Sequence, residues 1–283
     1  MLERFFSWLQ KTRRRWLYGL SSLLLVASLG IIQPEPSYGI SWMELLFRGV
    51  QTYQICNMSL QQEMRLGQQI NQQVKKDIKI SQNQTINRYI NRLGQRLATN
   101  SDHPDINYTF QVVRDDAINA FATMGGFVYI NTGLMKAAAN EAELASVVAH
   151  EIGHIEGRHS VDQLCQRARN STLLSAAGLD ESAAVNIGVE LALNRPNSRS
   201  DESEADQLGL NLLRQGGYAP YAMVTFMETL MRRGGASPPT FLSTHPATSD
   251  RIRALKAQID PATANVGNGL NAQSYRRNIR TLR

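Results

Sequence analysis

The chain has 283 residues, of which 42% are hydrophobic and 19% charged, and its formal net charge is +6. This composition excludes a disordered chain and allows one large folded domain or two small ones. The first 39 residues hold five Lys or Arg against two Glu and so supply +3 of that charge. Because no basic patch interleaved with aromatic residues follows, we expect no nucleic-acid partner.

The N-terminal segment 1–39 has the layout of an export signal. Basic residues precede the uncharged apolar run Leu17–Ile32, and Pro34 and Pro36 follow it. The run is slightly short for a membrane-spanning helix, so a cleaved signal peptide is favoured over a retained membrane anchor. In either case the positive-inside rule places the rest of the chain on the exported side. We therefore expect a periplasmic or membrane-associated protein.

The next 60 or so residues indicate helices. Segment 41–58 is amphipathic and would pack on the domain or contact a membrane surface. The helical spacing of apolar residues from Ser59 to Ala98 predicts two helices that are separated near Ser81. Cys56 and Cys165 are the only cysteines. In an exported protein they could form one disulfide or remain two buried thiols.

Two segments with strand character follow. Residues Tyr108–Arg114 alternate apolar and polar side chains, which predicts a strand. Phe127–Ile130 is a short β-rich run that begins after paired glycines. We expect it to be an edge strand. Either an extended substrate peptide adds to it, with Gly126, Phe127, Val128 and Tyr129 as candidate substrate-binding residues, or it is ordinary sheet structure with no substrate role.

The remaining elements are predicted to be helical. The helix that begins after Asn140 carries a capping-box-like Glu143 and ends near Gly157. Gly153 inside it should cost roughly 1 kcal/mol relative to Ala, which suggests close packing at that point. Further helices are expected at 160–195, 198–213, 221–232 and 250–258. We expect a folded domain over 40–258 and a loosely ordered tail over 259–283.

The sequence His-Glu-Ile-Gly-His at 150–154 carries the strongest chemical signal. Positions four apart lie on one face of a helix, so His150 and His154 would converge on one metal ion. Glu151 would lie beside them as a general base. A chance occurrence on a solvated helix is the alternative, so the context must decide.

A catalytic zinc site needs a third protein ligand. A third histidine in the extended HExxHxxGxxH pattern would stand at position 160, but that residue is Ser160, and His159 is one position early. A helix further along offers Glu202 and Asp206, four residues apart on one face. Glu202 can ligate zinc, and Asp206 can accept the second N–H of a ligand histidine. Glu204 should point away.

The chain resembles the HtpX/BepA-like zinc metallopeptidases, the family that includes the CAAX prenyl endopeptidases. The matching segments are NAF…GGFVYINTGLM at 119–135, NEAELASVVAHEIGH at 140–154, SRSDESEAD at 198–206, GGYAP at 216–220 and STHPATSDRI at 243–252. The resemblance implies that His150, His154 and Glu202 ligate one zinc ion per chain and that Asp206 supports them. Met124 stands where many members have proline, and the helical-repeat domain of BepA-type members does not follow the HP motif.

The resemblance implies a zinc-dependent endopeptidase that acts on exported or envelope proteins in quality control. Glu151 would be its general base. His245 would stabilise the oxyanion or occlude the fourth zinc position, or it would simply cap the following helix. The alternative function is a latent zinc-binding assembly factor with little proteolysis. A CAAX-type peptidase is excluded, because that branch needs several transmembrane helices and this sequence has one apolar run. His103 and His159 are expected at the surface.

The expected fold is α+β: a helical bundle around the site, with a small, mostly antiparallel sheet beside the 140–157 helix. The substrate specificity and the oligomeric state do not follow from the sequence.

Overall fold

The computed structural model describes residues 50, 52–174, 181–194, 196–233, 239–246 and 249–282, and within 171–174 it describes the backbone alone. The predicted export signal at 1–39 and most of the amphipathic stretch 41–58 lie outside this part of the chain. Within it, no helix is long and apolar enough to cross a membrane.

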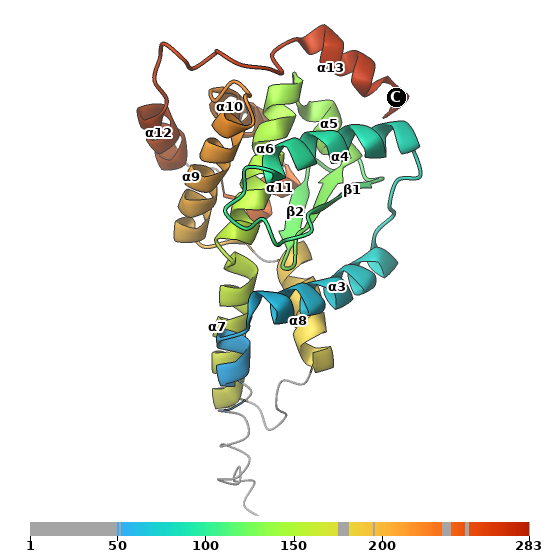
Figure 1. Ribbon diagram of the computed structural model, residues 1–283, viewed down its shortest axis with the longest axis vertical. Helices are drawn as coiled ribbons and strands as arrows, with labels where there is room; N and C mark the ends of the chain where they lie inside the picture. Colours follow the sequence, from blue (N-terminus) through green and yellow to red (C-terminus); the bar gives the residue numbers. More distant parts are fainter. Residues whose placement is uncertain are drawn as a thin grey trace, which may run out of the picture. The chain divides into compact units, whose positions relative to one another are not determined.

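The described elements are mostly helices, with one small sheet (Figure 1). Before and within the sheet come α3 (Leu60–Asp77), α4 (Gln84–Ala98), β1 (Thr109–Val113), β2 (Ala120–Thr123) and β3 (Phe127–Asn131). After it come α5 (Thr132–Ala137), α6 (Glu141–Glu156), α7 (His159–Leu174), α8 (Glu181–Asn194), α9 (Arg199–Gln215), α10 (Ala222–Arg233), α11 (Thr240–Thr244), α12 (Ser249–Gln258), α13 (Ala272–Asn278) and the 3-10 helix η1 (Arg280–Leu282). The predicted α+β class is confirmed.

The sheet is mixed rather than mostly antiparallel. Its strand order is β1-β3-β2, with β1 parallel and β2 antiparallel to β3. The expectation of an edge strand at Phe127–Ile130 is therefore wrong, because β3 is the central strand and is paired on both sides. Gly125 and Gly126, at φ of 79° and 94°, form the tight turn from β2 to β3. The turn pairs β2 with β3, and β2 is therefore the last strand of the sheet, with one free edge that no other described strand covers.

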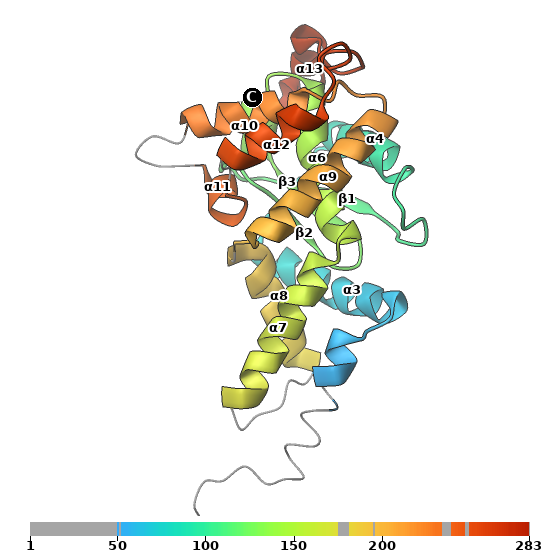
Figure 2. The ribbon, with the colours of Figure 1, turned by 90° about the vertical axis from the view of Figure 1, so that its left-hand side faces the viewer.

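Side chains alternate across the sheet and build two cores. The larger core lies on the face of Phe110, Val112, Val128 and Ile130, where α4 and α6 cover the sheet and α9 and α10 pack on α6. The smaller core lies on the opposite face, which is covered by α3 and α8, with α7 packed on α8. Its buried members are Met58, Ile70, Val74, Val113, Phe121, Met124, Tyr129, Val161, Leu164, Ala184 and Leu191. Figure 2 shows α3, α7 and α8 together at one end of the domain, below β2.

Helix α6, which carries the His-Glu-Ile-Gly-His sequence, begins and ends as predicted. The Asn140 side chain accepts a hydrogen bond from the Glu143 N–H, and the Glu143 carboxylate accepts one from the Ala139 N–H. These bonds satisfy amide groups that lack partners in the first turn. Gly157 is the C-terminal cap.

Helices α6 and α9 approach each other closely because each presents a glycine to the other's backbone. A Cβ atom on Gly153 would lie 2.7 Å from the Ala205 carbonyl oxygen, and one on Gly209 would lie 2.9 Å from the His150 amide nitrogen. The predicted close packing at Gly153 is confirmed. The contact also fixes α6 against the helix that carries Glu202 and Asp206.

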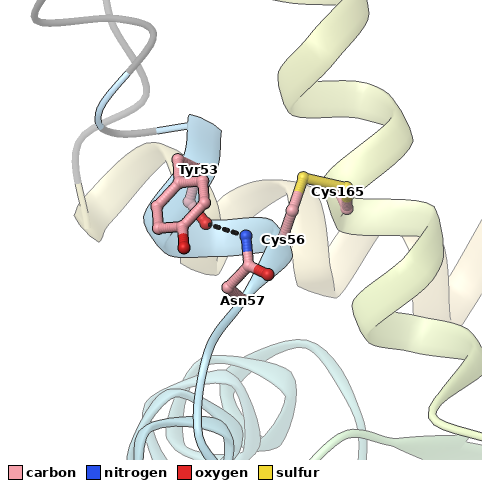
Figure 3. Close-up of a disulfide and its surroundings, with 4 residues drawn as sticks. All are labelled: Tyr53, Cys56, Asn57 and Cys165. Atoms are coloured by element: carbon pink, nitrogen blue, oxygen red, sulfur yellow. Dashed lines mark hydrogen bonds between the residues drawn. A yellow bond between two sulfur atoms is a disulfide. The ribbon is translucent and has the colours of Figure 1, made fainter.

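The two cysteines form a disulfide between Cys56 and Cys165, with Cα atoms 4.8 Å apart (Figure 3). It joins the segment before α3 to α7, 109 residues further along. Of the two alternatives that the sequence left open, the disulfide is the one observed.

The tail after Gln258 packs on the larger core, so the expectation of loose order is wrong. Ile259, Ala264 and Tyr275 are buried, and the Tyr275 hydroxyl donates to the Met135 carbonyl. The Gly269 carbonyl accepts a hydrogen bond from the Ala142 N–H at the start of α6. A few apolar residues in a polar sequence are enough to attach the tail, and composition alone did not reveal them.

Candidate metal centre

The two histidines of α6 and the glutamate of α9 come together as the sequence suggested. His150 Nε2 and His154 Nε2 lie 3.1 Å apart. The Glu202 carboxylate reaches both, with Oε2 at 3.5 Å from His150 Nε2 and Oε1 at 3.3 Å from His154 Nε2. All three side chains are buried. Three nitrogen and oxygen donors therefore converge on one point.

His245, at the C-terminal end of α11, joins this group. Its Nδ1 lies 3.0 Å from Glu202 Oε1, 3.3 Å from His150 Nε2 and 3.2 Å from His154 Nε2. One donor atom from each of the four residues lies within 4.8 Å of the others. Neutral imidazole and carboxylate are donors that suit Zn²⁺, so this donor set fits a metal ion.

A buried network of charged groups holds the donors in place. His150 Nδ1 lies 3.1 Å from Asp206 Oδ1. Arg251 on α12 donates to both Asp206 oxygens at 2.7 Å and, through Nη1, to Glu202 and to the Pro246 carbonyl. A carboxylate at the second ring nitrogen orients a histidine and leaves the other nitrogen free to bind a metal.

Sequence reasoning missed Arg251, although a signal for it was available. Glu202 and Asp206 are four apart on a helix that packs against α6, and both are buried. Two buried carboxylates require a cation, and Arg251 lies within the quoted segment STHPATSDRI.

Two further residues beside the site also differ from expectation. His159 was expected at the surface, but it is 3% exposed, and its Nδ1 lies 2.7 Å from His154 Nδ1. It is the first residue of α7, directly after the turn that ends α6, and this turn directs it inward. Asn197 was not predicted and donates to Glu202 Oε1 at 2.9 Å. Glu204 is exposed and lies 3.4 Å from His159 Nε2, away from the donors.

Glu151 stands apart from this network. It is fully buried, and its Oε1 lies 3.5 Å from His245 Nε2. Among the residues that the structure describes, none gives either carboxylate oxygen a hydrogen bond of ordinary geometry, although the Ala122 backbone N–H on the free edge of β2 is close enough to lower the Glu151 pKa slightly. Burial raises the pKa of Glu151, and the nearby His245 and His150 only partly oppose this. A buried carboxylate with no hydrogen bond of ordinary geometry, beside a group of metal donors, can exchange a proton with a molecule that binds between them.

The charges at the site determine which groups are ionised. Burial works against the charged form of Glu202, but His245, His150 and His154 outweigh it and hold its pKa low. Burial likewise opposes ionisation of Asp206, and Arg251 and His150 lower its pKa. For His150, hydrogen bonds to Asp206 and Glu202 outweigh burial and raise the pKa to about 9. Burial lowers the pKa of His154 well below its usual value.

The free edge of the sheet borders this centre. The Asn119 carbonyl accepts from the Asn131 N–H, so Asn119 faces β3, and by alternation the backbone of Ala120 and Ala122 faces away from it. Ala122 lines a pocket together with Glu151, His154 and His245. The earlier candidates on β3 are placed differently. Gly126 lies in the turn, Phe127 is half-buried, and Val128 and Tyr129 are fully buried in the two cores.

These features define the class of the protein. Two convergent histidines on one helix, an adjacent buried glutamate and a carboxylate from a second helix make up the residue pattern of an HExxH-type metallopeptidase. The model of peptidase family M48 matches residues 84–259, more than half of the chain. The chain belongs to peptidase family M48.

Individual relatives agree with this assignment. The beta-barrel assembly-enhancing protease of Escherichia coli strain K12 is 32% identical over 244 residues, which are 81% of this chain and 50% of that protein. The putative beta-barrel assembly-enhancing protease of Vibrio cholerae is 37% identical over 175 residues, 56% of this chain and 36% of that protein. The mitochondrial metalloendopeptidase OMA1 of Schizosaccharomyces pombe is 33% identical over 173 residues, 59% of this chain and 51% of that protein. The chain thus spans about half the length of these relatives, or less.

Proposed function

We propose that this protein is a zinc-dependent endopeptidase. The observation that carries the proposal is the convergence of His150, His154 and Glu202 beside Glu151, whose buried oxygens accept no hydrogen bond of ordinary geometry among the described residues. Three protein donors leave a coordination position for water, as in catalytic zinc sites. A zinc ion held there would polarise the scissile carbonyl and activate water as the nucleophile.

The chain's own residues then have distinct tasks. Glu151 takes the proton of the attacking water and delivers it to the leaving amine. Its raised pKa suits this exchange, because a carboxylate that readily holds a proton can also pass it on. Asp206 and Arg251 position His150 and Glu202 through the buried bonds described above.

The free edge of β2 is the proposed substrate strand, in place of β3. The outward backbone groups of Ala120 and Ala122 would pair with an extended peptide, and backbone pairing tolerates many side chains. The Ile118 carbonyl on the same outward side already accepts a hydrogen bond from the Phe241 N–H of α11, so α11 borders the same edge.

The second candidate function is a latent zinc-binding assembly factor. The specific observation in its favour is His245, whose Nδ1 lies among the other three donors and would fill the position that a substrate needs. A zinc ion with four protein ligands is typical of structural sites. We propose that His245 blocks the metal in this state and that its withdrawal permits catalysis.

The proposed substrates are exported or envelope proteins that are damaged or misassembled, and the proposed location is periplasmic or membrane-associated. The support is the sequence of segment 1–39 together with the relatives, two of which are named as proteases that enhance beta-barrel assembly. The names of those relatives describe them and not this chain. No nucleic acid is proposed as a partner.

The test is digestion of unfolded casein by residues 40–283 with zinc, with chelator and after zinc is restored. Glu151→Gln should lower turnover by roughly 10²-fold to 10⁴-fold. The variant should still bind about one zinc ion per chain. Glu190→Gln, the same change at an exposed carboxylate that pairs with Arg167 on α7, should retain activity. His245→Ala distinguishes the two candidates, since it should raise the activity of a latent enzyme. Chelator-resistant digestion, or full activity in Glu151→Gln, would contradict the proposal.

A further inference from the structure

We propose that His159 positions His154 for the metal ion and that Glu204 orients His159 in turn. This inference rests on the proposed zinc site and adds two residues that support one of its donors. A histidine that ligates a metal needs a partner for its second ring nitrogen, which fixes the tautomer and the orientation of the ring. The two histidines of α6 have different partners at that nitrogen.

The second nitrogen of His150 faces a carboxylate, whereas that of His154 faces another histidine. His150 Nδ1 lies 3.1 Å from Asp206 Oδ1. His154 Nδ1 lies 2.7 Å from His159 Nδ1, and His159 Nε2 lies 3.4 Å from Glu204 Oε2. His159 therefore stands between His154 and a carboxylate and links the two.

The short distance between the two Nδ1 atoms determines where the protons lie. Only one proton fits between two nitrogen atoms that are 2.7 Å apart, so one ring donates and the other accepts. A neutral ring that binds a metal through Nε2 carries its proton on Nδ1, so His154 is the donor. His159 then accepts at Nδ1 and, as a neutral ring, carries its own proton on Nε2.

Glu204 favours the same arrangement. With the proton of His159 on Nε2, that nitrogen donates to the Glu204 carboxylate, whereas a proton on Nδ1 would turn a lone pair toward the negative charge. The carboxylate therefore keeps the Nδ1 lone pair of His159 available to His154. The Glu204 side chain is 59% exposed, and water weakens the effect of an exposed charge. We therefore expect His159 to contribute more than Glu204.

The turn after α6 brings His159 to this position. Arg158, at φ of 53°, separates α6 from α7. A Cβ atom on Gly157 would lie 2.5 Å from His159 Nε2, so the ring occupies space that the side chain of any other residue would fill. A histidine one position early for a third ligand thus reaches the Nδ1 side of His154 and does not join the donor group.

The alternative is a buried histidine that only fills space, and two substitutions distinguish the two roles. His159→Phe keeps a ring of similar size and removes both nitrogen atoms. His159→Asn is smaller, but its side-chain oxygen is bonded to Cγ, as Nδ1 is, and can accept the proton of His154. A space-filling role predicts that Phe is tolerated better than Asn, and a positioning role predicts the reverse.

The first experiment measures zinc affinity by competition with a chelating indicator. His159→Phe should bind zinc about 10–100-fold more weakly than the unmodified protein, and His159→Asn should recover most of this loss. Glu204→Gln should lose less affinity than His159→Phe. His103→Phe, the same change at a histidine outside the donor group, should retain full affinity. Urea unfolding in chelator checks that each variant is folded.

The second experiment observes the ring nitrogens directly. The Glu151→Gln protein, which should not digest itself, is labelled with ¹⁵N at its five histidines and loaded with zinc. Long-range ¹H–¹⁵N correlation spectra distinguish the two neutral tautomers from each other and from the charged ring. His159 should carry its proton on Nε2, and His154 should carry its proton on Nδ1. A space-filling role requires neither result.

The outcomes separate this inference from the proposed function. Unchanged zinc affinity in His159→Phe overturns the inference and leaves the zinc site in place. So does a greater loss in His159→Asn than in His159→Phe, or a proton on Nδ1 of His159 in the zinc-loaded protein. Zinc binding without chelator-sensitive cleavage contradicts the endopeptidase, while the affinities of the variants still support or overturn the role of His159. An unmodified protein that binds no zinc contradicts both.

Discussion

The two faces of the sheet are stabilised by different means. On the face of the larger core, α6 and α9 meet backbone to backbone at Gly153 and Gly209. All the proposed metal donors come from α6, α9 and the end of α11 on this side. On the face of the smaller core, the Cys56–Cys165 disulfide joins the segment before α3 to α7, and the buried Glu63 of α3 pairs with the partly exposed Arg158.

The difference shows how each region meets its own requirement. A metal centre needs donor positions fixed to within a fraction of an ångström, and close helix packing provides that. The smaller core only has to hold α3, α7 and α8 together beside the sheet, and a covalent link can do so without defining side-chain positions as closely. Damage to the larger core should therefore affect metal binding, whereas damage to the smaller core should affect stability alone.

Removal of the disulfide should give the largest loss of stability. Replacing Cys56 and Cys165 together by Ser should lower the free energy of unfolding by about 4 kcal/mol, because the bond closes a loop of 109 residues in the unfolded chain. Urea unfolding measures this loss. Zinc affinity should stay within a factor of two or three, since neither cysteine touches the donors.

A reductant should reproduce this effect in the unmodified protein and cause no further loss in the double variant. A tenfold fall in zinc affinity would show that the smaller core also positions the metal centre, and the comparison would fail.

A change in the helix contact at Gly153 should have the next largest effect. In contrast to loss of the disulfide, it should lower zinc affinity strongly and stability only moderately. Gly153→Ala places a methyl group 2.7 Å from the Ala205 carbonyl, and overpacking of this kind costs about 1–3 kcal/mol. The higher helix propensity of alanine offsets roughly 1 kcal/mol of that cost. Because α9 must move away, zinc affinity should fall at least tenfold. Titration with a zinc indicator measures this.

Ser203→Ala, on an exposed part of α9, is the control. It should leave both the free energy of unfolding and the zinc affinity unchanged. Gly153→Ala with unchanged zinc affinity would show that the donors do not depend on the spacing of the two helices.

The larger core and its site were largely predictable from sequence, because the signals there are local. Two histidines four apart, a glycine between them and an acidic pair on a later helix are each read from a short window. The sheet was less predictable: β3 looks like an edge strand until β1 pairs with its other side. His159 could not be placed either, because one turn after α6 determines whether it faces solvent or His154. Arg251 lies 45 residues from Asp206, and only tertiary structure brings the two together.

Loss of a buried polar network in the smaller core should reduce stability by a smaller amount. The Asn71 side-chain oxygen accepts hydrogen bonds from Gln111 at 2.9 Å and from the Tyr129 hydroxyl at 2.7 Å. Asn71→Ala leaves both donors buried and unsatisfied, which should cost about 1–2 kcal/mol. Thermal unfolding measures the loss. Asn87→Ala, on α4, is the control for loss of an amide, and zinc affinity should stay unchanged in both variants.

The pH dependence of the Glu63–Arg158 pair gives the smallest expected effect. Glu63 is 1% exposed, and Arg158 Nε donates to it at 2.8 Å. Burial raises the pKa of Glu63 above 4.5, and Arg158 only partly opposes this. The folded protein therefore binds the proton more tightly than the unfolded chain. The resulting stabilisation is complete below pH 4.5 and is lost as the pH rises through the folded pKa.

Urea unfolding of the protein and of Glu63→Gln between pH 4 and 7, in chelator, measures this directly. The free energy of unfolding of the protein minus that of the variant should decrease as the pH rises, by about 1.4 kcal/mol for each unit that the pKa is raised. Asp116 is the control with the opposite sign, because Lys136 lowers its pKa. The free energy of unfolding of the protein minus that of Asp116→Asn should decrease only as the pH falls. If the difference for Glu63→Gln increases with pH, the attraction of Arg158 outweighs burial, and the ion pair stabilises the smaller core at neutral pH.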